Sequence, residues 1–243
     1  MMIRAEGISK HYGAFQAVHP MDLEVRAGEV FGFLGLNGAG KTTTLRMLGG
    51  VLPPSEGRIW IDGVGLHGTG ADADPVEARR RMGFIPDRPY LYDKLTAREF
   101  LRFRGEMYGM ARGTLAQEID HRIAEQQLSH VADALVESFS HGMKQRLTLA
   151  GALLTRPRVL IVDEPMVGLD PRGARQIKQV FRDVAAEGRT VFLSTHTLEV
   201  AAEVCDRLAI VHQGRIAVLG TPTEVVGDDE TLEDVFLRIT GAA

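Results

Sequence analysis

The glycine-rich segment from Gly35 to Thr42 constrains this chain more than any other part of its sequence. It reads Gly-Leu-Asn-Gly-Ala-Gly-Lys-Thr and fits the pattern G-x-x-x-x-G-K-[ST]. An apolar, strand-like run from Val30 to Leu34 precedes it, and a helix-like run from Thr42 to Leu48 follows. The pattern forms a phosphate-binding loop in this strand–loop–helix context. The sequence therefore predicts a nucleotide site, with an ordinary glycine-rich turn as the alternative.

Each part of this loop has a predicted task. Glycines let the backbone approach phosphate groups closely, and successive N–H groups can then surround an anion. The helix that follows adds the positive end of its dipole. We predict that Lys41 reaches the β- and γ-phosphates of ATP and that the Thr42 hydroxyl binds Mg²⁺. The other predicted ATP-binding residues of the loop are Asn37, Gly38, Ala39, Gly40 and Thr43.

Composition limits the class of protein further. The chain has 243 residues, of which 44% are hydrophobic, and a formal net charge of −4. It is long enough for a sizeable core, and its acidic balance gives no electrostatic footprint for nucleic acid. The single cysteine, Cys205, suits a reducing compartment. The longest apolar stretch, Leu147 to Leu154, is far shorter than the ~20 residues of a membrane span. We therefore expect a cytoplasmic chain that reaches a membrane only through a partner.

The order of the apolar runs predicts a mixed α/β fold. The first 30 residues contain short strand-like runs with turns. Three later apolar runs, at 159–162, 190–194 and 208–211, alternate with helix-like segments. This alternation is typical of a parallel sheet.

The middle of the chain has a different character. Residues 96–140 contain few strand signals and carry apolar residues at helical spacing. Thr96 and Thr114 each begin a capping-box pattern, which predicts that a helix begins after each of them. The sequence therefore predicts a helical insertion in an otherwise α/β chain.

Two carboxylates, Asp163 and Glu164, follow the apolar run at 159–162. Open α/β sheets bind ligands at the carboxyl ends of their strands. In that position Asp163 can hold Mg²⁺, directly or through water, and Glu164 can orient or deprotonate an attacking water. The alternative is a strand end that simply turns polar, and the phosphate loop in the same chain favours the catalytic interpretation.

A second possible anion site begins at Ser140. Ser140 is a natural N-cap, and Gly142 lets a phosphate or a backbone segment come close. Because the phosphate loop already supplies one anion site, a second is surplus within one chain unless it serves the nucleotide of another chain. An ordinary capped helix is the alternative. His196 likewise follows a strand-like run, where a lone histidine is commonly incidental.

The order and spacing of these motifs resemble the nucleotide-binding domain of ATP-binding cassette (ABC) transporters along nearly the whole chain. The resemblance implies that Tyr12 stacks on adenine. It implies that Ser140 and Gly142, in the signature motif, contact the γ-phosphate bound to the opposite subunit. It also implies that Asp170, in the D-loop, lies at the dimer interface and that His196 contacts the γ-phosphate.

The sequence departs from the family pattern at two places. Asp87 follows Ile85-Pro86 where the family usually has a glutamine that senses Mg²⁺ and touches the membrane partner. A carboxylate there can still meet Mg²⁺ or its water, but it adds negative charge near the triphosphate. The signature motif reads Ser-His-Gly-Met instead of the common Ser-Gly-Gly-Gln, so His141 and Met143 alter its surroundings.

The resemblance implies an α/β fold with a P-loop NTPase core and a mainly parallel sheet, an N-terminal antiparallel β subdomain and a helical subdomain. We expect one ABC ATPase domain over residues 1–243. Residues 1–86 and 151–225 would form the ATP-binding core with the β subdomain. Residues 87–150 would form the helical subdomain, and residues 226–243 a C-terminal helix.

The implied function is ATP hydrolysis by a subunit that powers transport. Two chains, as a homodimer or a heterodimer, would close head-to-tail around two ATP molecules and drive a separate transmembrane permease at the inner face of the membrane. Each site would combine the catalytic residues Lys41, Glu164 and His196 of one chain with Ser140 and Gly142 of the other.

Two short segments favour export. The motif Ser-x-Gly-Met-Lys-Gln and the ending Leu-Glu-Asp-Val-Phe at 232–236 resemble cassettes that serve ABC-2-type exporters and the related Ecs-like group. The alternatives are a soluble ABC-type ATPase that acts on nucleic acid or ribosomes and a small-molecule kinase. The first usually carries two cassettes or basic extensions, and the second leaves the signature motif and D-loop unexplained.

Overall fold

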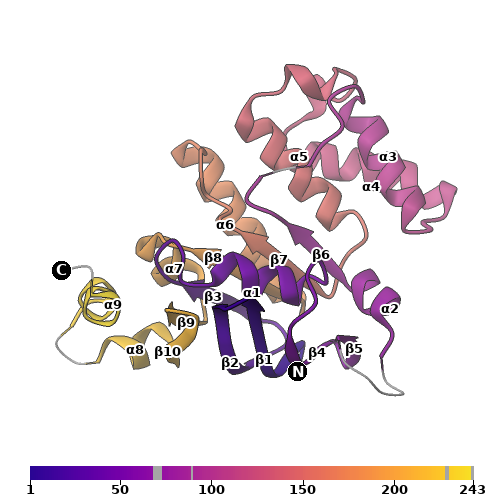
Figure 1. Cartoon of the computed structure of the whole chain (residues 1–243). Helices are drawn as coiled ribbons and strands as arrows, with labels where there is room; N and C mark the ends of the chain where they lie inside the picture. Colours follow the sequence, from indigo (N-terminus) through magenta and orange to yellow (C-terminus); the bar gives the residue numbers. More distant parts are fainter. Residues whose placement is uncertain (68–72, 89, 228–229, 242–243) are drawn as a thin grey trace.

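The computed structural model describes residues 1–67, 73–88, 90–227 and 230–241. In this part of the chain, two β-sheets lie on either side of helix α1 (Lys41–Leu48), and a group of helices forms a separate lobe beyond the larger sheet (Figure 1). The mixed α/β class, with an antiparallel β subdomain and a mainly parallel sheet, is confirmed.

The larger sheet has the strand order β10-β9-β3-β8-β7-β6. Neighbouring strands of this sheet pair in parallel, except that β10 runs antiparallel to β9. Every residue of β3, β7 and β8 is buried, as expected for strands that are covered on both faces. The six strands are β3 (Val30–Leu34), β6 (Met82–Ile85), β7 (Val159–Asp163), β8 (Thr190–Thr195), β9 (Arg207–His212) and β10 (Arg215–Gly220).

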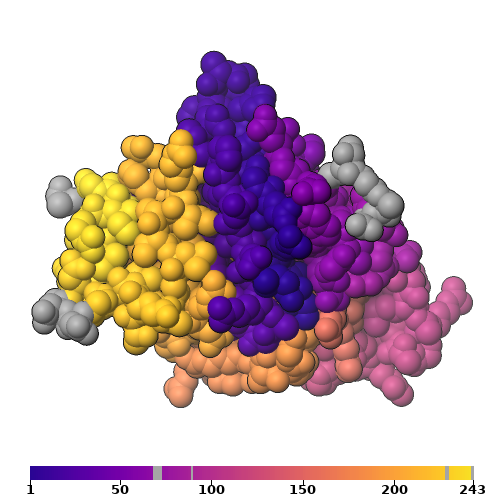
Figure 2. All heavy atoms as spheres, turned by 90° about the horizontal axis from the view of Figure 1, so that it is seen from below, coloured from indigo at the N-terminus to yellow at the C-terminus, as the bar shows by residue number. Residues whose placement is uncertain are grey.

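The smaller sheet is antiparallel, with the strand order β2-β1-β4-β5. In Figure 2 the indigo N-terminal segment, which carries the first two strands of this sheet, lies between the yellow C-terminal segments and the purple residues that include its other two strands. Pro20 lies where the pairing between β1 and β2 shifts register, so its missing N–H interrupts no regular ladder. The strands are β1 (Ile3–Tyr12), β2 (Phe15–Val25), β4 (Glu56–Ile61) and β5 (Val64–His67).

Two hydrophobic cores fill the space on the two faces of the larger sheet. On one face, α1 and the smaller sheet pack against alternate strand residues, where Phe31 stacks on Phe192 with ring centroids 5.5 Å apart. On the other face, residues from five helices cover the remaining strand residues. These helices are α5 (His141–Leu153), α6 (Pro171–Ala186), α7 (Leu198–Val204), α8 (Pro222–Val226) and α9 (Leu232–Thr240).

The helical lobe has a core of its own. It contains α3 (Ala97–Met107), α4 (Arg112–Glu125), two 3₁₀ turns at Ser129–Val131 and Val136–Ser138, and the first part of α5. The capping box at Thr96 is confirmed. The one expected at Thr114 is wrong, because α4 already begins at Arg112 with Ala111 as its N-cap.

Helix α5 joins the lobe to the larger sheet. Leu147 and Ala150 pack in the core of the lobe, whereas Leu149 and Leu153 pack against the sheet. The expected division between residues 150 and 151 therefore falls inside a continuous helix that belongs to both parts.

The end of the chain packs beside the larger sheet. Helix α9 buries Leu232, Val235 and Phe236 there, and the short helix α8 (Pro222–Val226) precedes it. Residues 228–229 and 242–243 of the expected C-terminal segment lie outside the described residues. One further short helix, α2 (Pro75–Arg80), leads into β6. Among the helices of the described part, none has the length and hydrophobicity needed to cross a bilayer.

Candidate functional site

Four adjacent strands of the larger sheet end at the same edge. They are β3, β8, β7 and β6, and because they are parallel their carboxyl ends lie next to one another. The phosphate loop follows β3, and the carboxylates at 163–164 end β7. His196 follows β8, and Asp87 follows β6 after one proline. The topology thus brings residues that are far apart in the sequence to one edge of the sheet, where open α/β sheets bind ligands.

The phosphate loop depends on glycine at two positions where the fold leaves no alternative. Gly40 has φ +100°, and a Cβ atom there would lie 2.8 Å from the carbonyl oxygen of Ala17. A Cβ atom on Gly35 would lie 2.5 Å from the carbonyl oxygen of Val211. Gly40 is also the N-cap of α1, so the loop delivers the N-terminal N–H groups of this helix to the sheet edge.

Lys41 begins α1 and is almost completely buried, with 6% of its surface exposed. Its Nζ donates to the carbonyl oxygens of Gly35 at 2.7 Å and Leu36 at 3.3 Å, and lies 3.7 Å from a carboxylate oxygen of Glu164. Burial lowers the pKa of Lys41 below its usual range, although Glu164 and Asp163 act in the opposite direction. The structure therefore holds this cation at the loop, next to the predicted catalytic carboxylate.

Asp163 is buried at the end of β7, and Ser194 on the neighbouring strand donates a hydrogen bond to it. Burial raises the pKa of Asp163 above its usual range, whereas hydrogen bonds from Ser194 and Thr42 act against that rise. The charge of nearby Asp87 raises the pKa of Asp163 further. Two carboxylates and a threonine hydroxyl thus lie close together, and these are the oxygen ligands that Mg²⁺ prefers.

Glu164 adopts a left-handed backbone conformation with φ +50°, which is uncommon outside glycine. Its N–H points at the carbonyl oxygen of Ser194 at 3.3 Å and the Ser194 hydroxyl at 3.2 Å. Its side chain is 17% exposed, and one carboxylate oxygen lies 3.0 Å from Nδ1 of His196. The carboxylate of Glu164 therefore links Lys41 to His196, the histidine expected to contact the γ-phosphate.

A cavity of about 350 Å³ opens in front of the phosphate loop. Glu164 and Asp87 line it, and Tyr12, which is 50% exposed, contributes an aromatic ring. Ala39 is not among the lining residues, because its side chain is buried and its N–H donates to Leu36. The loop residues that line the cavity are Leu36, Asn37, Gly38, Gly40, Lys41, Thr42 and Thr43.

The structure places the predicted residues of the signature motif and the D-loop elsewhere. Ser140, Gly142 and Asp170 line a different cavity, of about 510 Å³, between the start of α5 and the start of α6. Ser140 caps α5, since its hydroxyl accepts a hydrogen bond from the N–H of Met143 at 3.3 Å, and Asp170 caps α6 through the N–H of Gly173 at 2.8 Å. Ser140 and Asp170 therefore act as helix caps within their own chain and face a cavity that the phosphate loop does not line.

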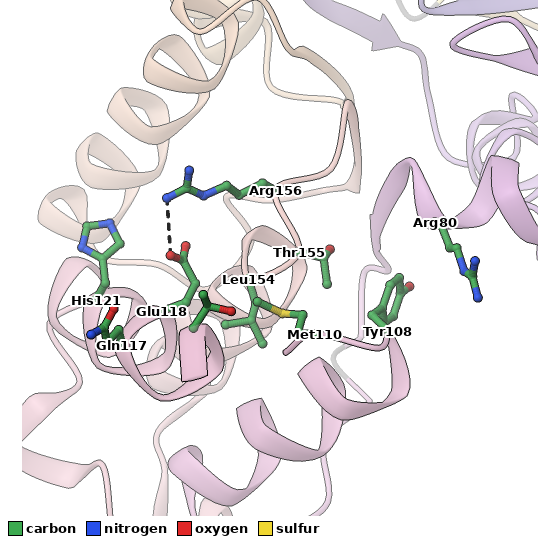
Figure 3. Close-up of a pocket in the computed structure, with 10 residues that line it drawn as sticks. Arg80, Tyr108, Met110, Gln117, Glu118, His121, Leu154, Thr155 and Arg156 are labelled. Carbon is green, nitrogen blue, oxygen red and sulfur yellow. Dashed lines mark hydrogen bonds and ion pairs between the residues drawn. The ribbon is translucent and has the colours of Figure 1, made fainter. Parts of the chain in front are cut away.

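A larger cavity, of about 680 Å³, lies between α2, α4 and the end of α5 (Figure 3). Arg80, Tyr108 and His121 are among the residues that line it, and an ion pair between Arg156 and Glu118 crosses one side. Among the residues described, no part of the phosphate loop or of the carboxylate pair lines this cavity. The volume of a cavity therefore does not identify the nucleotide site. The site is identified by the polar groups that converge at the strand ends.

Three residues of the site were missed or only partly interpreted from the sequence. Phe15 pairs with Tyr12 at the tip of the β1–β2 hairpin and lines the same cavity, which its aromatic ring close to Tyr12 could have indicated. Ser194 donates to the Asp163 carboxylate and accepts from the backbone N–H of Glu164, a role that no sequence pattern shows. Nε2 of His141 lies 3.2 Å from the carbonyl oxygen of Val167, so this departure from the family pattern has a defined contact.

Comparisons with known proteins agree with this arrangement. The sequence profile described as ABC transporter matches residues 18–167. The Nod factor export ATP-binding protein I of Ralstonia nicotianae is 37% identical over 225 residues, which cover 93% of this chain and 68% of that protein. A solved ATP-binding subunit of an ABC transporter has a TM-score of 0.90 at 31% identity, covering 98% of this chain and 99% of that one. A dimeric bacterial ABC transporter cassette has a TM-score of 0.82 at 25% identity, covering 90% and 98%.

The fold and the edge of the sheet define a P-loop ATPase with an added β subdomain and a helical lobe. With these similarities, the chain belongs to the ABC transporter family, and it is an ATP-hydrolysing subunit of such a transporter. The nucleic-acid ATPase and the small-molecule kinase are not favoured.

Proposed function

We propose that this chain is the ATPase subunit of an exporter and that two copies, or this chain and a homologous one, close around two Mg²⁺–ATP. One observation carries the proposal: the predicted nucleotide residues lie in two separate cavities of one chain. Lys41 and Glu164 line the first, whereas Ser140 and Asp170 line the second. Each chain therefore offers two half-sites, and a head-to-tail pair would complete both.

Within the first half-site, the side chains suit the steps of phosphoryl transfer. Lys41 supplies a cation to the β- and γ-phosphates, and Tyr12 a ring for the adenine. Glu164 takes the proton of the attacking water, and His196, bonded to Glu164, meets the γ-phosphate.

The oxygen ligands near Thr42 suit Mg²⁺. Thr42 and Asp87 both lie close enough to Asp163 to affect its pKa: Thr42 lowers it and the charge of Asp87 raises it. A divalent cation would offset the cost of burying Asp163 as an anion, and it would neutralise charge that develops on the phosphates. We propose Thr42 and Asp163 as its ligands, with Asp87 in the place of the usual glutamine.

Export through a separate membrane permease is the proposed use of the hydrolysis. It is supported by the similarity to the Nod factor export ATP-binding protein. It is also supported by two exporter-like segments, the motif Ser-x-Gly-Met-Lys-Gln and residues 232–236. Closure by binding and release by hydrolysis give two states, and a membrane partner at the inner face of the membrane could follow them.

Complementation tests the shared site. Lys41→Ala disables the first half-site of a chain and Ser140→Ala the second, so each variant alone is expected to hydrolyse ATP slowly. A mixed dimer retains one site with both halves intact, so mixing the two variants should restore activity. Ser129→Ala, an exposed serine in the helical lobe, is the matched control.

Two outcomes would contradict the proposal. The first is a mixture no more active than the mean of its components. The second is full activity in a strictly monomeric form, because specific activity should rise with protein concentration. Co-purification with a multi-span protein encoded beside this gene tests whether the chain has a membrane permease as its partner.

A further inference from the structure

His141 and Gln145 hold the same backbone carbonyl. Nε2 of His141 lies 3.2 Å from the carbonyl oxygen of Val167, and Nε2 of Gln145 donates to that oxygen at 2.9 Å. The two side chains are four residues apart on α5 and therefore project from one face of the helix. The start of α5 is thus joined at a single point to the loop between β7 and α6.

Val167 in turn closes a turn that begins at Glu164. The N–H of Val167 points at the carbonyl oxygen of Glu164, with a distance of 3.4 Å. Because the left-handed backbone of Glu164 is strained, it persists only where its surroundings hold it. Ser194 holds the N–H side of Glu164, and the turn to Val167 holds its carbonyl side.

The imidazole of His141 also packs against this loop. Gly168 has φ +75°, and a Cβ atom there would lie 2.7 Å from Cδ2 of His141. The loop therefore passes directly along the imidazole, with no room for a side chain between them. Val167 itself is 51% exposed, so its side chain contributes little anchoring and its carbonyl is the point of attachment.

Gln145 also lies near the end of β7, from which the loop that contains Val167 departs. It lines a small cavity together with Asp163 and Pro165, the residues on either side of Glu164. Helix α5 is therefore in place against the strand end from which the loop departs, and His141 and Gln145 fix the loop a few residues later. The catalytic carboxylate lies between these two attachments.

We propose that His141 is a positioning residue for the Glu164 of its own chain. By holding Val167 together with Gln145, it keeps the Glu164 carboxylate in contact with Lys41 and His196. Its neighbour Ser140 serves the nucleotide of the other chain, so adjacent residues at the start of α5 act on two different sites. This inference rests on the proposed function, which assigns Glu164 the role of base.

The first test compares His141→Ala with His141→Gln. Removing one hydrogen bond should lower kcat about two- to tenfold. KM for ATP should change less than kcat, because His141 lines the second cavity but no part of the phosphate-loop cavity that holds Glu164. Glutamine should restore kcat, since its Nε2 can reach the same carbonyl. The control is His130→Ala, an exposed histidine of the helical lobe. An unchanged kcat, or a change in KM alone, overturns the proposal.

The second test asks which site responds. Dimers are purified through two different tags, so that each contains one Glu164→Gln chain and one active chain. Placing His141→Ala on the active chain should slow hydrolysis. Placing it on the Glu164→Gln chain should leave the rate of the reference dimer unchanged. The reverse pattern means that His141 acts through the signature motif on the nucleotide of the other chain, and overturns the proposal.

The proposed dimer and the proposed role of His141 can each fail without the other. If tagged chains do not form mixed dimers, the dimer of the proposed function is wrong. In that case the kcat comparison between alanine and glutamine at position 141 still decides whether His141 positions Glu164.

Discussion

Replacing Glu164 by glutamine tests the chemistry of the site with the least structural change. Glutamine has the same size, so it can keep the hydrogen bond to His196, whose Nδ1 is 3.0 Å from the Glu164 carboxylate. It cannot accept a proton from water. It also removes a negative charge 3.7 Å from Lys41, so the site repels the triphosphate of ATP less. We expect ATP binding to persist and turnover to fall.

The size of the fall distinguishes two roles for Glu164. Loss of a general base costs a factor of about 10² to 10⁴, which is about 2.7 to 5.4 kcal/mol of barrier. If Glu164 only oriented His196, the loss would be that of one hydrogen bond to a side chain that is 52% exposed, a factor of about two to ten. The structure favours the first value, because the carboxylate lines the cavity in front of the phosphate loop.

The assay is single-turnover hydrolysis of radiolabelled ATP, with nucleotide affinity measured on the same samples by equilibrium binding. Glu233→Gln, an exposed glutamate at the start of α9, controls for the general effect of removing a carboxylate. A loss below tenfold with binding intact would refute the role of Glu164 as the base. A loss of binding as large as the loss of turnover would refute the claim that the substitution spares the nucleotide site.

Two further predictions concern stability. Because burial raises the folded pKa of Asp163 above 3.8, the contribution of Asp163 to the free energy of unfolding falls as pH rises from 3.8 through that pKa. Without Mg²⁺ or nucleotide, Asp163→Asn should therefore be at least as stable as the parent chain near about pH 8. Urea unfolding should show that this advantage shrinks towards about pH 4. A difference in stability that stays constant with pH would contradict the prediction. Gly40→Ala meets both positive φ and a backbone oxygen at 2.8 Å, so it should lose about 1–3 kcal/mol. Gly38→Ala, with positive φ but open space at the added Cβ, should lose less, and equal losses in urea unfolding would rule out the contact with Ala17.

Capping patterns in the sequence predicted one helix start correctly and one incorrectly. Thr96 with Glu99 forms the expected capping box, because both partners lie within one turn. Thr114 carries a similar pattern, yet α4 starts earlier, at Arg112. Leu115, in the first turn of α4, is buried in the core of the lobe, and burial of this kind outweighs a cap of about 1 kcal/mol.

Domain limits were harder to predict. The family resemblance suggested a division between residues 150 and 151, and α5 runs continuously through these residues. Its apolar residues serve the lobe on one side and the sheet on the other. Composition along the chain cannot show this, because it does not tell which side of a helix meets which neighbour.

The sequence by itself determined the chemistry that this protein has available. A phosphate loop, a pair of carboxylates after an apolar run and a capped glycine-containing helix start are local patterns, and their order sufficed to indicate the family. Only the tertiary structure decided how they are grouped. The parallel order of β3, β8, β7 and β6 brings Lys41, Glu164 and His196 together, while α5 carries Ser140 to another cavity. Contacts between residues far apart in the chain, such as His141 with Val167, depend on packing and leave no local pattern to read.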